Sequence, residues 1–142
     1  MANKKENKID IILPNFNSSG YIKETIKSII DQTFKNWKLI IVDDCSDKKT
    51  RILLKKFSKN KRIKIYWLKK NKGAGYCRNY AIKKSKSLYL AFIDSDDLWK
   101  ITIIFLLIQT MKLLEKKQNS FLLQKNTILK NLFVILLFVQ AQ

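Results

Sequence analysis

Histidine is absent from this chain of 142 residues, and cysteine is nearly so. Without an imidazole the protein cannot use a histidine as general base, and a zinc site is not expected. The two cysteines, Cys45 and Cys77, lie in different segments and do not form a C-x-x-C pattern. Two isolated thiols fit a reducing compartment. These absences exclude histidine-based acid–base chemistry and favour a cytoplasmic protein.

Long hydrophobic runs are also absent. The two longest apolar stretches, at residues 101–108 and 132–139, are far shorter than the roughly 20 residues that a membrane-spanning helix needs. Residues 1–7 are polar, with no apolar run behind them, so they are predicted to be disordered rather than a signal peptide. We therefore expect no transmembrane segment, and contact with the inner face of the cytoplasmic membrane stays open.

Acidic residues are scarce, because 11 Asp and Glu stand against 29 Lys and Arg, which gives a formal net charge of +18. Such a charge is typical of proteins that bind nucleic acid, an anionic membrane surface or a polyanionic ligand. The lysines, however, are spread singly and in pairs along the chain, and no nucleic-acid-binding motif accompanies them. Compositional bias of the source genome is an alternative reason for the charge, and a specific nucleic-acid role is not favoured.

Two hydrophobic periods alternate in the first hundred residues. Short apolar runs predict four buried strands, at residues 9–13, 38–42, 63–68 and 88–93. Between them apolar side chains recur at helical spacing, most clearly at Ile22, Ile26, Ile29, Ile30 and Phe34. Ser18 or Ser19 is expected to cap this first helix. The alternation predicts a single α/β domain, with a mostly parallel sheet and helices on both of its faces.

Polar residues follow each predicted strand. In parallel α/β sheets, ligands bind beyond the carboxyl ends of the strands. We therefore expect four groups to gather at one edge of the sheet: Asn15 with Asn17, Asp43 with Asp44, Asn71 with Gly73, and Asp94 with Ser95, Asp96 and Asp97.

Three of the few acids stand together in LYLAFIDSDDLWK, residues 88–100. Carboxylates at this spacing repel one another unless a cation lies among them. A D-x-D at the end of a strand suits Mg²⁺ or Mn²⁺, which prefer oxygen ligands and often take the remaining ones from phosphates and water. The alternative is a solvated loop whose aspartates cap the next helix. An EF-hand is excluded, because Trp99 and Phe105 occupy the positions of its Gly and Glu.

The other candidate positions are less specific. Asp43 and Asp44 could accept hydrogen bonds from a ribose or a base, or could cap the following helix. Arg78, after a G-x-G, could meet a phosphate or pair with one of the acids. Dinucleotide binding is disfavoured, because residues 14–20, PNFNSSG, lack the glycine fingerprint expected after a first strand.

Taken in order, four motifs give a specific resemblance: IDIILPNFN, QTFKNWKLIIVDD, NKGAGYCRN and LAFIDSDDLW. Together they resemble the nucleotide-binding half of the family 2 glycosyltransferases, which have the GT-A fold. The resemblance covers residues 8–100. It implies a Rossmann-like half-domain that binds a nucleotide-sugar donor, most readily a UDP-sugar, with Mg²⁺ or Mn²⁺ as cofactor.

The resemblance also implies residue roles. Pro14 and Phe16 line the base pocket, and Asp44 hydrogen-bonds the base, while Asp43 supports the loop. The positions implied near the ribose and diphosphate are Asn71, Gly73, Arg78, Asp94 and Ser95. Asp96 is implied as the metal ligand, with Asp97 in or near the metal site.

Family members transfer the sugar with inversion at the anomeric carbon, to glycan or lipid-linked acceptors, in the synthesis of cell-surface polysaccharide or lipid-linked glycan. Inversion needs a carboxylate base on the acceptor side. Residues 101–142 contain one acid, Glu115, in a Lys-rich context unlike the family's acceptor region, so no catalytic base is assigned.

The expectation is therefore a donor-binding half followed by a helical, apolar and Lys-rich tail at residues 101–142. The chain is expected to be truncated or aberrant after Trp99. Whether it turns over a substrate is left open. A second hypothesis is a non-catalytic basic protein that binds an anionic membrane or nucleic acid.

Overall fold

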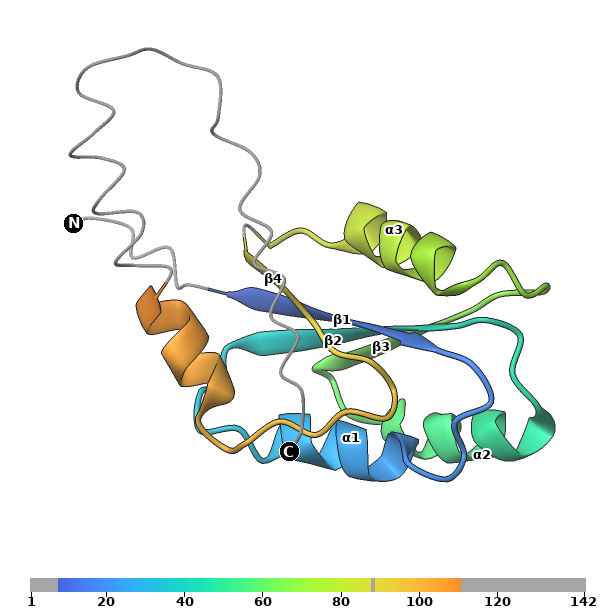
Figure 1. The fold of residues 1–142 in the computed structure, drawn as a ribbon, viewed down its shortest axis with the longest axis horizontal. Helices are drawn as coiled ribbons and strands as arrows, with labels where there is room; N and C mark the ends of the chain where they lie inside the picture. Colours follow the sequence, from blue (N-terminus) through green and yellow to red (C-terminus); the bar gives the residue numbers. More distant parts are fainter. Residues whose placement is uncertain (1–7, 88, 111–142) are drawn as a thin grey trace, which may run out of the picture.

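The computed structural model describes residues 8–87 and 89–110. Its centre is a four-stranded, wholly parallel sheet with the strand order β3-β2-β1-β4 (Figure 1). The strands are β1 (Ile9–Asn15), β2 (Trp37–Asp43), β3 (Ile63–Trp67) and β4 (Tyr89–Phe92). The helices between them are α1 (Ile22–Ile30), α2 (Lys48–Phe57) and α3 (Ala74–Lys84). The expected α/β fold, with a parallel sheet, is confirmed.

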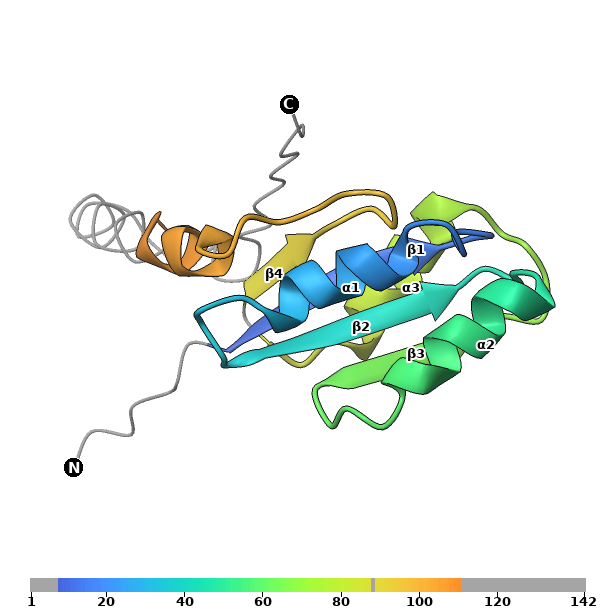
Figure 2. The ribbon, with the colours of Figure 1, turned by 90° about the horizontal axis from the view of Figure 1, so that it is seen from below.

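The two central strands, β1 and β2, are buried on both faces, which explains why they are almost continuously apolar. On one face Ile11, Leu13 and Ile41 pack with side chains of α1 and α2. On the other face Ile12 and Ile40 pack against Cys77 and Ala81 of α3. Figures 1 and 2 show α1 and α2 on one side of the sheet and α3 on the other. All seven residues of β1 are buried, so this strand forms the centre of both cores.

The start of α1 differs from the expectation. Neither Ser18 nor Ser19 caps the helix, whose N-cap is Tyr21 without a side-chain hydrogen bond. The Ser18 hydroxyl instead donates to the side chain of Asn15, and its carbonyl oxygen accepts the backbone N–H groups of Tyr21 and Ile22. The serine is therefore used to close the loop after β1, a role that local spacing does not distinguish from capping.

The chain after β4 returns along α1. The Gln32 side chain donates to the carbonyl of Lys100 (2.8 Å) and to that of Ser28 (3.0 Å), and it accepts the backbone N–H of Ile104 (3.1 Å). A helix begins at Ile103, and the buried side chains of Ile104 and nearby apolar residues join the core under α1. Gln32 is itself fully buried, so it acts as the polar clamp of this segment.

Two expectations concern residues that the structure does not describe. The disordered N-terminus, residues 1–7, and most of the tail, residues 111–142 with Glu115, lie outside the described residues. Within residues 8–87 and 89–110, no helix combines the length and apolarity that crossing a bilayer requires.

Replacing Gln32 by Leu should lower the free energy of unfolding by about 2–3 kcal/mol, because it leaves a buried N–H and two partly buried carbonyls without the Gln32 side chain as partner. Urea unfolding measures the change. The exposed neighbour Asp31 is the matched control, and Asp31→Ala should stay within about 0.5 kcal/mol of the wild type. A Gln32→Leu protein as stable as the control would contradict the clamp.

Candidate functional site

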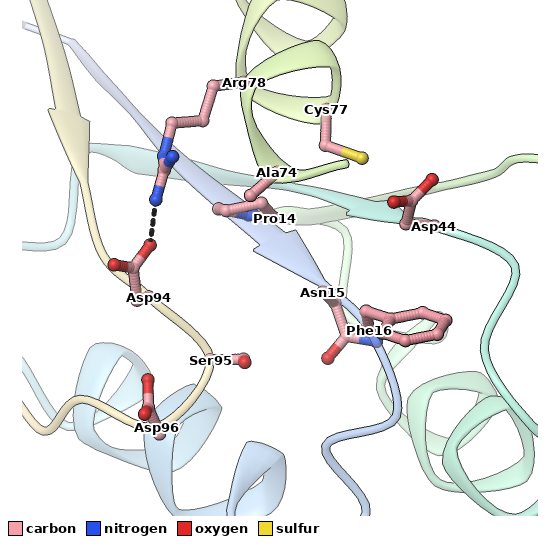
Figure 3. A pocket seen from close by; sticks show the side chains of 10 residues that line it. All are labelled: Pro14, Asn15, Phe16, Asp44, Ala74, Cys77, Arg78, Asp94, Ser95 and Asp96. Carbon is pink, nitrogen blue, oxygen red and sulfur yellow. Dashed lines mark hydrogen bonds and ion pairs between the residues drawn. The ribbon is translucent and has the colours of Figure 1, made fainter. Parts of the chain in front are cut away.

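A pocket of about 260 Å³ opens at the carboxyl edge of the sheet. The chain runs outward from β1 through β2 to β3 and then crosses back to β4 on the other side of β1, so the direction of winding reverses at this edge. Open α/β sheets bind ligands at such a reversal. The lining residues come from the ends of β1 and β2, the first turns of α3 and the loop after β4: Pro14, Asn15, Phe16, Asp44, Ala74, Cys77, Arg78, Asp94, Ser95 and Asp96 (Figure 3).

Asp43, the last residue of β2, connects the segments that meet at this edge of the sheet. Its carboxylate accepts the Asn15 side-chain amide at 2.8 Å and the Ser46 backbone N–H at 3.2 Å, and it pairs with Arg51 at 3.3 Å. Asp43 is fully buried. A buried carboxylate requires such partners, so this residue supports the loops and does not line the pocket.

Asp44 has its carboxylate directed toward the other side of the strand and holds the loop after β3. Its two oxygens accept the backbone N–H groups of Lys72 and Gly73, both at 2.7 Å. Gly73 has φ of +86°, a conformation that a side chain would strain, which explains a glycine at the start of α3. Carboxylate oxygens have two acceptor positions each, so Asp44 retains acceptor capacity toward the pocket.

The opposite side of the pocket carries the acids of the D-S-D-D sequence. Arg78 on α3 donates to Asp94 at 2.6 Å, with about a third of each side chain exposed. The exposed carboxylate of Asp96 lies below this pair in Figure 3. Thr25 on α1 donates to the backbone carbonyl of Ser95 at 2.7 Å, which fixes the loop that presents these acids.

Asp97 follows these acids in the sequence but is outside the pocket lining. Its backbone N–H donates to the carbonyl of Asp94 at 3.2 Å. Burial raises the pKa of the Asp97 carboxyl, and the neighbouring Asp96 and Asp94 carboxylates raise it further. The local excess of negative charge is the feature expected beside a cation site.

Cys77 lies fully buried at the base of the pocket, with its sulfur directed toward Asp44 (Figure 3). Burial raises the pKa of the Cys77 thiol to about 12, and the Asp44 carboxylate contributes to the shift. The thiol is therefore protonated at neutral pH and serves as a small apolar surface rather than as a nucleophile.

The resemblance gives a donor-binding or metal role to ten positions. Seven of them line one pocket: Pro14, Phe16, Asp44, Arg78, Asp94, Ser95 and Asp96. Asn71, Gly73 and Asp97 do not line it, although Gly73 contacts Asp44. Sequence reasoning did not single out Cys77, Ala74 or Thr25. Cys77 and Ala74 lie in the NKGAGYCRN motif, which was the only sequence signal for them. The hydrogen bond from Thr25 to Ser95 spans 70 positions, and no local pattern indicates it.

Neither Asp43 nor Asp44 caps the next helix. The cap of α2 is Asp47, whose side chain accepts the Thr50 backbone N–H at 2.7 Å. This hydrogen bond lowers the pKa of the Asp47 carboxyl.

The donor set can be tested against a divalent metal. Among residues 8–87 and 89–110, no three His, Cys, Asp or Glu side chains form a group that could enclose a metal. Mg²⁺, however, is commonly held by one or two carboxylates, with substrate phosphates and water completing its six oxygens. Asp96 presents an exposed carboxylate in the pocket, so the residues fit this open mode of binding.

The structure is an α/β fold with a candidate ligand pocket at the carboxyl edge of its sheet, and comparison with known proteins assigns its family. The family model "Glycosyl transferase family 2" matches residues 10–120, more than three quarters of the chain. The chain belongs to glycosyltransferase family 2. This match includes residues 101–120, so it continues past residue 100, where the motif resemblance ended.

Individual relatives agree with this assignment. The chain is 34% identical, over 94% of its length, to the UDP-Glc:alpha-D-GlcNAc-diphosphoundecaprenol beta-1,3-glucosyltransferase WfgD of Escherichia coli, of which it covers 51%. It is 40% identical, over 68% of its length, to WfaP of Escherichia coli, a protein with the same described activity, of which it covers 38%. The chain thus spans about half of the curated relatives it matches, or less.

A solved structure gives the same result. The crystal structure of S. aureus TarS 1–349 in complex with UDP-GlcNAc superposes with a TM-score of 0.61 and 34% sequence identity. The match covers 64% of this chain and 27% of that one. The GT-A fold inferred from the sequence motifs is thereby confirmed.

Asp43→Ala should lower the free energy of unfolding by about 3 kcal/mol, because one N–H of the buried Asn15 amide and the Ser46 backbone N–H lose their acceptor, and the other Asn15 hydrogen bond, to Ser46 Oγ, remains. Asp43→Asn keeps one acceptor oxygen and should cost less than the alanine variant. Thermal unfolding of both proteins measures the order. Equal stability of Asp43→Ala and the wild type would refute the role of Asp43 as the anchor of this edge.

Alkylation should distinguish the two cysteines. In a Cys45→Ser protein, iodoacetamide near pH 8 should modify Cys77 about a thousandfold more slowly than in urea, because the raised pKa leaves so little thiolate. Mass spectrometry follows the modification, and Cys77→Ser provides the control in which only Cys45 can react. If native Cys77 reacted as quickly as the denatured chain, the thiol would be neither buried nor protonated.

Proposed function

We propose that this chain supplies the donor-binding half of an inverting glycosyltransferase that uses a nucleotide-diphosphate sugar, most readily a UDP-sugar, and a divalent cation. The observation that carries the proposal is the single pocket that combines Phe16 and Asp44 on one side with Asp94, Ser95 and Asp96 on the other. A nucleotide has the matching order of groups, with a flat base at one end and a charged diphosphate at the other. The ligands and reactions named for WfgD, WfaP and TarS support the same donor class.

The residues of the pocket suggest how the donor is held. Phe16 is exposed and Pro14 adjoins it, so they offer an apolar surface to the base, while the Asp44 carboxylate offers acceptors to its N–H edge. Arg78 neutralises Asp94 and brings a cationic group to the side where the diphosphate would lie. Asn71 and Gly73 belong to the adjoining wall, whose backbone Asp44 fixes.

Asp96 would hold the cation, and Asp97 stands next to it in the sequence. When bound, a divalent cation neutralises the charge that develops on the leaving diphosphate. In the transfer itself an acceptor hydroxyl oxygen bonds to the anomeric carbon from the face opposite the diphosphate. The bond from that carbon to the phosphate oxygen breaks, its electron pair leaves with the diphosphate, and the hydroxyl proton passes to a base. No described residue is assigned as that base.

The acceptor proposed is a glycan or lipid-linked glycan of the kind used in cell-surface polysaccharide synthesis. WfgD and WfaP act, by their names, on a diphosphoundecaprenol-linked sugar. The place of action proposed for this chain is accordingly the cytoplasm, at the inner face of the membrane that carries such acceptors.

Isothermal titration of UDP into the protein with Mn²⁺ tests the proposal. Wild-type protein should bind UDP, and Asp96→Asn should weaken the Mn²⁺-dependent binding by at least about tenfold, because the loss of a carboxylate removes a metal ligand. Asp31→Asn, an equal charge change on an exposed residue at the end of α1, is the control and should bind as the wild type does. Absence of UDP binding by the wild type, or indifference to Asp96→Asn, would reject the proposal.

A further inference from the structure

The charges of this protein are segregated along the sequence. Residues 48–93 contain 13 lysines and three arginines but no aspartate or glutamate. The described acids all lie before or after this stretch, at residues 10–47 and 94–97. Because α2, β3 and α3 fall within it, these three elements carry lysine and arginine but no acid of their own, and the nearest exposed acid is Asp47 at the N-cap of α2.

The arginines and lysines of this stretch behave differently. Each arginine already has a partner: Arg51 pairs with Asp43, Arg62 lies 3.9 Å from the ring centroid of Trp37, and Arg78 pairs with Asp94. All 13 lysines are exposed. Their ammonium groups are therefore the charges available to an external partner, as separate point charges rather than as bidentate donors.

Tyrosines are grouped with some of these lysines. Because α3 packs against β1 and β2, it leaves the adjacent face of β3 only partly covered. On that face Tyr66 meets Tyr80 edge to face, with ring centroids 5.6 Å apart, and the Lys84 ammonium lies 5.4 Å from the Tyr80 centroid. We call this surface the Tyr–Lys shelf, and it comprises Lys64, Tyr66, Lys72, Tyr76, Tyr80 and Lys84.

We infer that the Tyr–Lys shelf docks on an anionic lipid bilayer. Lysines next to a bilayer are attracted to its diffuse negative surface charge, and tyrosine prefers the interface because it has an apolar ring and a polar hydroxyl. Nucleic acid fits less well. Stacking with bases needs free ring faces, whereas Lys84 lies over Tyr66 and Tyr80, and Lys72 lies over Tyr76.

The position of the shelf gives this docking a consequence. Lys72 belongs to the shelf through its side chain, while its backbone N–H binds Asp44 of the pocket. The shelf and the donor pocket therefore share one loop, and a docked shelf keeps the pocket close to the lipid surface. This consequence, the supply of a lipid-carried acceptor, rests on the proposed function, whereas the docking itself does not.

Vesicle sedimentation with the full chain tests the inference. The wild type should bind vesicles of phosphatidylcholine with about one third phosphatidylglycerol at roughly 0.15 M salt, and should release them at about 1 M salt, where charges are screened within about 3 Å. It should bind pure phosphatidylcholine vesicles much more weakly. The test variant changes Lys64, Lys83 and Lys84 to Gln, and Lys83 is the exposed neighbour of the shelf on α3. Each lysine contributes about a fivefold factor, so the affinity should fall about 100-fold.

A matched variant changes three exposed lysines on the other side of the molecule, Lys23, Lys27 and Lys100, to Gln. It removes the same charge and should lose less than about tenfold in vesicle affinity. An equal loss in both variants, or no loss in the shelf variant, would overturn the inference, as would binding of duplex DNA in preference to the anionic vesicles. UDP titration of the shelf variant should match the wild type. Vesicle binding that depends on the shelf, in a protein that does not bind UDP, would refute the proposed function and leave the docking intact.

Discussion

Two adjacent carboxylates at the end of β2 organise this protein. Successive residues of a strand point to opposite faces of the sheet, so Asp43 and Asp44 reach different neighbours. Asp43 gathers Asn15, the Ser46 backbone and Arg51, and Asp44 gathers the backbone of Lys72 and Gly73. Together they connect the ends of β1 and β2 with the loop that leads into α3. These contacts, together with the loop after β4, therefore determine the shape of the pocket.

The loop after β4 is held in a different way. Thr25 and Ser28 of α1, and Gln32 just after this helix, bind backbone groups of residues 95–104. On one face of the sheet, α1 and the residues just after it thus position the acids of the D-S-D-D sequence. On the opposite face, α3 supplies Arg78. The two sides of the pocket are consequently built by elements from opposite faces of the sheet. A nucleotide that spans the pocket would contact both.

Acidic residues, arginines and lysines occupy different parts of the structure. The described acids lie at the pocket edge, on and beside α1, at the start of β1 and at the N-cap of α2, whereas α2, β3 and α3 carry lysine without acid. The described arginines contact aspartates and tryptophan rings within the protein. In the pocket the cationic side chain is Arg78, so the lysines around the β3 edge lie outside it and are available for the bilayer contact inferred above.

The sequence by itself determined the class of fold and the edge at which the site lies. Apolar runs of strand length, alternating with helical periodicity, specify a parallel sheet because few other arrangements bury both kinds of segment, and the topology then collects the residues after each strand. Four motifs in order also indicated the family. Local spacing did not determine which polar residue contacts which. Ser18 closes a loop instead of capping α1, Asp47 rather than Asp43 or Asp44 caps α2, and Asp96 lines the pocket while Asp97 does not.

Only the tertiary structure decided that Gln32 and Thr25 hold the loop after β4, and that Cys77 lies beside Asp44. These contacts join residues separated by about 30 to 70 positions, and each depends on how α1 and α3 pack on the sheet. A buried polar group needs a hydrogen-bond partner, and the packing of the helices on the sheet decides which group lies within reach.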